Sequence, residues 1–261
     1  MNDKVIWITG ASSGIGEACA KKYIEEGWKV ILSARNEREL DRVRSESAHP
    51  ENAKVLILDL TETEEIVEKT TIAIELFGHI DVVLHSGGIS QRSLIKDTTI
   101  EVDRRLMEVN FFGTVALSKA ILPHFLDRKS GAFGIISSLV GKFGTPYRSS
   151  YSASKHALHG FFDTLRAELY KDKIQVTIIC PGFIKTNVSV NALTEDGSPL
   201  NKMDDAQANG MSPEKCAEKI FSAMKKKKRE VYIGGKEVFG VYAKRFFPGL
   251  FSKLIQTAKV R

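Results

Sequence analysis

The stretch VIWITGASSGIG, Val5–Gly16, joins a short apolar run to a glycine-rich turn and then to a helical pattern. The run Val5–Thr9 is typical of a strand that is covered on both faces. The three glycines allow a tight turn, and without a side chain they let the backbone approach a phosphate closely. Because the N–H groups at the start of a helix attract anions, this turn predicts a pyrophosphate site. We expect its residues to be Gly10, Ser12, Ser13, Gly14, Ile15 and Gly16.

Six further apolar runs follow along the chain, and stretches of helical period lie between them. This alternation predicts an α/β fold, a single-domain Rossmann-type doubly wound parallel sheet of about seven strands over residues 1–261, with helices on both faces. The expected strands are Val5–Thr9, Val30–Ser33, Val55–Leu58, Val82–Leu84, Gly134–Ser137, Val176–Cys180 and Val231–Ile233. The expected helices are Gly14–Glu26, Glu37–Ser45, Glu64–Phe77, Val102–Leu126, Tyr151–Tyr170 and Pro213–Lys227.

Two segments depart from this alternation. Residues 186–211 are polar and contain Gly and Asn, and a connection of that length is typical of a functional lid or a mobile loop. Residues 237–261 mix large apolar side chains with Lys and Arg. We expect this C-terminal extension to pack on the domain or on a neighbouring subunit, and the alternative is a basic amphipathic patch with weak affinity for a membrane surface.

Composition excludes several classes of protein. Lys plus Arg exceed Asp plus Glu by 38 − 32 = 6, which is too small and too dispersed an excess to indicate nucleic acid. The three cysteines lack metal-ligand spacing and the histidines form no H-E-x-x-H pattern, so we expect neither a metal site nor a disulfide framework. We also expect no membrane span and no signal peptide, and therefore a cytoplasmic location.

The end of the second expected strand discriminates between two cofactors. A carboxylate there would accept hydrogen bonds from the adenosine ribose and select NAD. Instead the chain has Arg35, whose guanidinium suits the 2′-phosphate of NADP, so NADP(H) is favoured and NAD is less expected. Asp59 follows the third strand and either accepts a hydrogen bond from the adenine amino group or caps the next helix, where Thr61 is also a candidate cap.

Three polar residues form a candidate catalytic group. Tyr151 and Lys155 are four residues apart on an expected helix and therefore share one face. An ammonium beside a phenol favours the phenolate, which would lower the phenol pKa. Ser138 lies at the end of the fifth strand, where ligands bind in such folds, and a hydroxyl there can hold a substrate oxygen beside the phenol. Its neighbour Ser137 should point the other way, and the choice of Ser138 over Ser137 depends on the resemblance described next.

Several independent motifs occur in a fixed order. They are TGASSGIG, Asn110 in NFFGT, Ser138, Tyr151-x-x-x-Lys155 and Pro181-Gly182 in CPGFIKT. In order and spacing they resemble the short-chain dehydrogenase/reductase family over about residues 4–235. The resemblance implies a small-molecule carbonyl or alcohol substrate and a homodimer or homotetramer. GGISQRS and LSAR are most similar to the dehydrogenase/reductase SDR family member 7 group, which implies NADP and lipophilic carbonyl substrates.

The resemblance also implies individual roles. Tyr151 is similar to the general acid that protonates the carbonyl oxygen, and Lys155 to the residue that binds the nicotinamide ribose and lowers the phenol pKa. Ser138 resembles the group that orients the carbonyl, Asn110 the holder of a proton-relay water, and Thr186 a contact of the carboxamide and diphosphate. The implied cofactor contacts beyond the glycine-rich turn are Gly87, Asn110, Tyr151, Lys155, Pro181, Gly182 and Thr186.

One motif departs from the family pattern. After the fourth strand most members carry N-N-A-G, whereas this chain has His85-Ser86-Gly87-Gly88. The two glycines still permit close passage of the backbone beside the adenosine ribose. We expect His85 to be a buried structural residue, and the alternative is a titrating residue beside the cofactor. For the chain as a whole, the alternative to an enzyme is a nicotinamide-binding regulator with silent chemistry, which the four catalytic-type residues disfavour.

Overall fold

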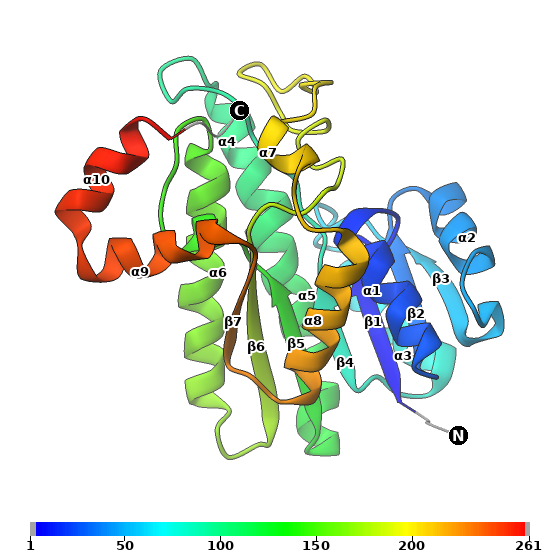
Figure 1. Ribbon diagram of the computed structural model, residues 1–261. Helices are drawn as coiled ribbons and strands as arrows, with labels where there is room; N and C mark the ends of the chain where they lie inside the picture. The colour runs from blue at the N-terminus through cyan, green and yellow to red at the C-terminus, as the bar shows by residue number, and fades with distance from the viewer. Residues whose placement is uncertain (1–3, 259–261) are drawn as a thin grey trace.

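The computed structural model describes residues 4–258, and all seven described strands form one parallel sheet in the order β3-β2-β1-β4-β5-β6-β7. Figure 1 shows helices on both faces of this sheet, so the predicted doubly wound α/β fold is confirmed. The strand order reverses between β1 and β4, the kind of position at which such sheets open a crevice. The strands are β1 Val5–Thr9, β2 Lys29–Ala34, β3 Ala53–Ile57, β4 Val82–His85, β5 Gly131–Ile136, β6 Ile174–Pro181 and β7 Glu230–Ile233.

Two helical layers enclose the sheet. Buried side chains of α1, α2 and α8 form the apolar cluster on one face, and those of α3, α5 and α6 form the cluster on the other. The helices are α1 Gly14–Glu25, α2 Glu37–Ser45, α3 Ile66–Phe77, α4 Ile100–Met107, α5 Gly113–Arg128, α6 Ser149–Glu168, α7 Asp205–Ala208, α8 Pro213–Lys225, α9 Phe239–Phe246 and α10 Pro248–Gln256.

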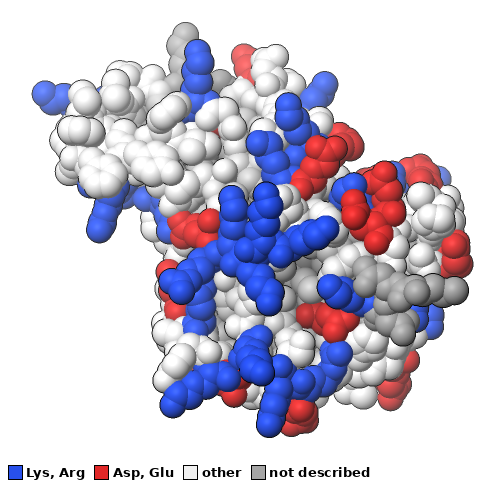
Figure 2. All heavy atoms as spheres, turned by 60° about the horizontal axis from the view of Figure 1, so that its bottom comes forward, with Lys and Arg blue, Asp and Glu red and all other residues white. Residues whose placement is uncertain are grey.

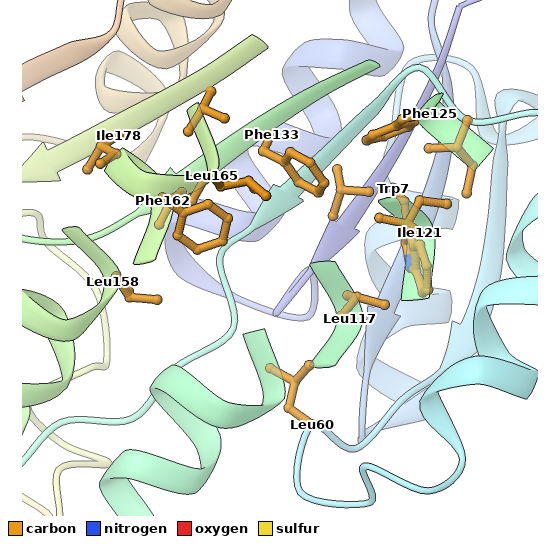
Figure 3. Close-up of a cluster of buried hydrophobic side chains, with 14 of the residues drawn as sticks. Trp7, Leu60, Leu117, Ile121, Phe125, Phe133, Leu158, Phe162, Leu165 and Ile178 are labelled. Carbon is orange, nitrogen blue, oxygen red and sulfur yellow. The ribbon is translucent and has the colours of Figure 1, made fainter. Parts of the chain in front are cut away.

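The central strand β1 shows why unbroken apolar runs are required here. Successive side chains of a strand point to opposite faces, so Trp7 enters one apolar cluster and Ile8 the other. Figure 3 shows Trp7 in the cluster that β5, α5 and α6 complete, with Phe133 and Phe162 close by. This packing fixes the strand ends that carry the polar residues of the site.

The predicted helix 102–126 is longer and less regular than expected. Helical structure runs from Ile100 to Arg128, but a π-helical turn, η2 (Glu108–Phe112), separates α4 from α5. By length and composition alone the whole segment is long and apolar enough to cross a membrane. Its side chains Leu117 and Phe125, however, are fully buried against the sheet, as Figure 3 shows, so one face of this segment belongs to the core.

The two segments outside the strand–helix alternation are both structured. Residues 186–211 contain the short helix α7, and several of their polar and apolar side chains, among them Ser189 and Leu193, are buried. This segment therefore packs into the body of the protein, and its role as a functional lid or a mobile loop stays a prediction. The C-terminal extension forms α9 and α10 as far as residue 258, and its last three residues lie outside the described part.

Candidate active site

A cavity of about 1800 Å³ lies along the carboxyl ends of the strands, across the point where the strand order reverses. Sites for single ligands usually measure roughly 300–1,000 Å³, so this cavity has room for a dinucleotide together with a substrate. All but one of the predicted site residues line it. They are Gly10, Ser12, Ser13, Gly14, Ile15, Gly16, Arg35, Asp59, Gly87, Ser138, Tyr151, Lys155, Pro181, Gly182 and Thr186.

The glycine-rich turn between β1 and α1 has the backbone that the sequence predicts. Gly10 and Gly14 have φ values of +65° and +58°, a region that side chains disfavour. A Cβ atom added to Gly16 would lie 2.1 Å from the carbonyl oxygen of Gly10, so the helix start can pack on the turn only without one. Since α1 begins directly after this turn, its N-terminus faces the cavity and provides N–H groups for an anion.

Arg35 and Asp59 are neighbours at the β2–β3 end of the cavity. The guanidinium of Arg35, with 64% of its side chain exposed, has Nη1 3.9 Å from Oδ2 of Asp59. Oδ1 of Asp59 accepts hydrogen bonds from the backbone N–H and the hydroxyl of Thr61, at 2.9 and 2.8 Å. Asp59 thus closes a turn and does not cap the next helix, because α3 begins only at Ile66.

A threonine joins the ends of β1 and β4, and a histidine joins β4 to α5. The hydroxyl of Thr9 accepts hydrogen bonds from the N–H groups of Ser86 and Gly87, at 3.2 and 3.1 Å. His85 is buried, and its Nε2 lies 2.9 Å from the hydroxyl oxygen of Ser118 in α5. Burial lowers the pKa of His85 to about 3, so the ring is neutral near pH 7. The structural interpretation of His85 therefore agrees with its surroundings.

Asn110 is the one predicted site residue that does not line the cavity. It lies in η2, buried, and its Oδ1 accepts a hydrogen bond from the N–H of Ile89 at 2.8 Å. Its Nδ2 donates to the carbonyl of Ile89 and to the hydroxyl of Ser154, both at 3.0 Å. Gly88 lies between Asn110 and Lys155. A Cβ added to Gly88 would lie 3.0 Å from Asn110 Oδ1 and 3.5 Å from Lys155 Nζ.

Ser138, Tyr151 and Lys155 meet at the β5–β6 end of the cavity. The Ser138 hydroxyl donates to the carbonyl of Pro181 at 3.4 Å, and it lies near enough to the Tyr151 phenol to oppose the rise of the phenol pKa. One helical turn further along α6, Lys155 is buried, and its Nζ donates to the carbonyl of Ile136 at 2.8 Å. That nitrogen lies 5.8 Å from the centre of the Tyr151 ring.

The neighbouring Ser137 points elsewhere. Its hydroxyl oxygen is 3.0 Å from Nε2 of the buried His159, and it also donates to the carbonyl of Lys155 at 3.3 Å. Since consecutive strand residues face opposite ways, the choice of Ser138 over Ser137 as the candidate partner of Tyr151 is consistent with this arrangement.

The charges around Tyr151 include two arginines besides the predicted lysine. Burial raises the pKa of Tyr151 above its ordinary value, and the nearby Ser138 hydroxyl and the charges of Arg92 and Arg148 oppose that rise. Burial also lowers the pKa of Lys155, to about 8, so this lysine is still largely an ammonium near pH 7. The two arginines therefore add positive charge near the phenol, and the effect of Lys155 on the phenol pKa stays a prediction.

These arginines belong to a buried ionic cluster that the sequence did not predict. Asp204 Oδ2 lies 2.7 Å from Arg92 Nε and 3.3 Å from Arg148 Nη2, and all three side chains are at most 5% exposed. Burial, followed by the charge of Arg92, lowers the pKa of Arg148 to about 10. The three residues come from the segment after β4, the start of α6 and the segment before α7, so no spacing indicated that they meet.

Comparisons with known proteins agree with this fold. The family model described as short chain dehydrogenase matches residues 4–197. The chain is 41% identical to dehydrogenase/reductase SDR family member 7B of Mus musculus, over 98% of this chain and 81% of that protein. It is 46% identical to dehydrogenase/reductase SDR family protein 7-like of Anopheles gambiae, over 89% of this chain and 75% of that protein.

A solved structure agrees with the arrangement of the whole chain. The crystal structure of a short-chain dehydrogenase from Streptomyces avermitilis superimposes with a TM-score of 0.83 at 29% identity, and the match covers 97% of this chain and 96% of that one. The likeness therefore extends beyond the sheet and includes most of the described C-terminal part.

Proposed function

This chain belongs to the short chain dehydrogenase family and is an oxidoreductase of that type, and we propose that it transfers hydride between NADP(H) and a carbonyl or secondary alcohol. One observation carries the proposal. The glycine-rich turn after the central strand β1 and the Ser138–Tyr151–Lys155 group at the β5–β6 end line the same cavity. A dinucleotide whose pyrophosphate lies at the first can extend towards the second.

The residues that would hold the dinucleotide suit its parts. Gly10 and Gly14 adopt the left-handed backbone that lets the N–H groups of the turn approach a pyrophosphate. A Cβ added to Gly14 would lie 3.1 Å from the Thr186 side chain, so the turn and Thr186 lie side by side on the cavity wall. We assign the nicotinamide ribose to Lys155 and the amide to Thr186. The bound cofactor supplies the hydride, and the chain supplies placement and charge.

The chemistry at the substrate oxygen follows from the polar group in α6. In reduction, the Tyr151 hydroxyl donates its proton to the carbonyl oxygen, and Ser138 donates a hydrogen bond to that oxygen. In oxidation the phenolate accepts the proton of the alcohol. Arg92 and Arg148 stabilise this phenolate, and their positions are fixed by the shared Asp204 carboxylate. Such general acid–base catalysis contributes roughly 10²- to 10⁴-fold.

We infer NADP(H) rather than NAD(H) from the residues at the end of β2. No carboxylate ends this strand, and the exposed guanidinium of Arg35 follows it directly on the cavity wall. The planar guanidinium suits the 2′-phosphate of NADP. For the substrate we infer a lipophilic carbonyl compound, because the side chains of Phe143, Phe183 and Leu193 line the cavity that Tyr151 enters.

The direct test is NADPH oxidation with a panel of ketones and aldehydes, with NADH measured in parallel. We expect turnover of apolar ketones and a higher kcat/KM with NADPH. Tight NADPH binding without turnover of any compound would favour the rival function, a nicotinamide-binding regulator.

We also propose a cytoplasmic homodimer or homotetramer. All three cysteines are buried free thiols, which suits a reducing compartment. Phe112, at the start of α5, is 47% exposed beside Phe111 and Phe161, and such a patch suits a subunit contact along α5 and α6. Light scattering after size exclusion tests the oligomer, and a monomer at micromolar concentration would contradict it.

A further inference from the structure

The hairpin made by α9 and α10 exposes an apolar stripe. Thirteen large hydrophobic side chains are exposed in residues 4–258, and six of them belong to this short segment, with exposed fractions between 48% and 71%. Within each helix their spacing of three or four residues places them on one face. The stripe consists of Phe239, Tyr242, Phe246, Phe247, Leu250 and Leu254.

The opposite side of the hairpin holds it against the body of the protein. Val241, Phe251 and Ile255 pack against the buried cluster on that face of the sheet. The rings of Phe251 and Phe143 lie 5.2 Å apart between their centres in an edge-to-face contact. Because these inner side chains pack against the core, most of the stripe faces outward, and Figure 1 shows the hairpin projecting beyond the sheet edge that β7 forms.

The charges on the hairpin are all of one sign. From Val238 to Ala258 the chain has no Asp or Glu, whereas Lys244, Arg245 and Lys253 are exposed beside the stripe. Figure 2 shows the hairpin at its upper left as a largely white surface with basic side chains at its edges, and a larger basic group on the body of the same face. The exposed run Lys225–Arg229 joins α8 to β7 at the lower edge of Figure 1, which Figure 2 brings forward.

The stripe is continuous with the cavity of the candidate site. Phe239 and Leu254 are largely exposed, and both also line the cavity that reaches Tyr151. Ala243 and Ile255 line the same part of its wall. One cavity therefore reaches from these residues of the hairpin to the catalytic group.

We propose that the α9–α10 hairpin docks on an anionic lipid bilayer, with its apolar stripe in the interface and Lys244, Arg245 and Lys253 on the headgroups. Exposed aromatic side chains flanked by cations bind such surfaces through apolar burial together with attraction to anionic lipid. A second copy of the hairpin suits the surface less, because a two-fold contact would place these cations opposite one another. The docked hairpin opens the cavity towards the lipid and admits a membrane-dissolved carbonyl substrate, a step that rests on the proposed function.

Vesicle flotation tests the docking without any substrate. The full chain is mixed with vesicles of phosphatidylcholine alone, or of phosphatidylcholine with phosphatidylserine, at low and at high salt. We expect flotation with the anionic vesicles, and a several-fold smaller bound fraction at high salt because salt screens the attraction. Phe246→Glu should reduce binding by about tenfold or more, since it places a carboxylate in the stripe.

The matched control is Val67→Glu, because Val67 in α3 is 67% exposed and Phe246 is 68% exposed. We expect this variant to float like the unmodified chain. Absence of flotation with every vesicle, or equal flotation of Phe246→Glu, would overturn the proposal. A dimer that Phe246→Glu dissociates, in a chain that does not float, would identify the stripe as a protein interface instead. An active chain that stays off vesicles refutes only the docking, and a chain that floats without turnover refutes only the proposed function.

Discussion

Replacing Lys155 by Met tests whether burial of the Lys155 ammonium lowers the free energy of unfolding. Burial lowers the pKa of this lysine from 10.5 to about 8, so near pH 7 the fold holds an ammonium that it disfavours. A shift of that size corresponds to about 3 kcal/mol. Against this, Lys155→Met leaves the carbonyl of Ile136 without its donor, which costs about 1–3 kcal/mol. We therefore expect a cofactor-free variant that is as stable as the unmodified chain, or up to about 2 kcal/mol more stable, and nearly inactive.

The pH dependence of the unfolding free energy separates the cost of the buried ammonium from the contribution of its hydrogen bond to Ile136. The folded pKa of Lys155 lies below its unfolded value, so the full cost of the ammonium is present below about pH 8 and disappears as the pH rises towards 10.5. Linkage then predicts that the unmodified chain gains about 1.3 kcal/mol over Lys155→Met between pH 7 and pH 9. The hydrogen bond to Ile136 contributes no such dependence.

Urea unfolding of the cofactor-free proteins at both pH values measures this difference. Lys171→Met, at an exposed position, is the control that removes a lysine without removing a buried ammonium. If Lys155→Met is destabilised by several kcal/mol at pH 7, or if its difference from the unmodified chain is the same at pH 9, the reasoning fails.

Three further predictions concern the cofactor and the ionic cluster. Arg35→Asp should raise the KM for NADPH by about tenfold or more and relatively favour NADH, because it exchanges a phosphate partner for a repelling charge; unchanged ratios in steady-state kinetics would contradict it. Asp204→Asn removes a negative charge beside two arginines, so the pKa of Tyr151 should fall, and the loss of reduction rate that accompanies ionisation of the phenol should begin at a lower pH. Arg148→Met should raise the pKa of Tyr151 and move that loss to a higher pH. Shifts of the kcat–pH profile in the same direction for both variants would refute this. Gly14 has a φ of +58°, so Gly14→Ala should introduce backbone strain of about 1–2 kcal/mol and weaken NADPH binding by about tenfold. Fluorescence titration measures the Kd, and an unchanged Kd would contradict this prediction.

Local chemistry made much of the fold and half of the site predictable. Central strands such as β1 and β4 are covered on both faces, so their residues are largely apolar without alternation and are visible in the sequence. The turn from Gly10 to Gly16 is likewise set by neighbouring residues, because the left-handed backbone and the close packing at Gly16 require glycine. Strand ends were less predictable. The fifth strand was expected from Gly134, but β5 begins at Gly131, and small residues such as Ala132 have a low propensity for strands and did not indicate this start.

The remaining features depend on contacts between distant segments. Arg92, Arg148 and Asp204 come from three parts of the chain, and each one alone has the appearance of a solvated surface charge. The π-helical turn that places Asn110 behind Gly88 depends on its bonds to the Ile89 backbone, which no helical periodicity reveals. The contribution of Arg92 and Arg148 to the positive charge near the phenol could therefore not be assigned before the structure was known.

The most direct test of the proposed chemistry compares the unmodified chain with Tyr151→Phe in a single-turnover assay of NADPH oxidation with a reactive apolar ketone. We expect NADPH to bind both proteins with similar affinity. Hydride transfer should fall by about two to four orders of magnitude in the variant, because the proton donor is gone. Comparable rates in the two proteins would show that the phenol does not protonate the substrate, and the account of this site would then be wrong.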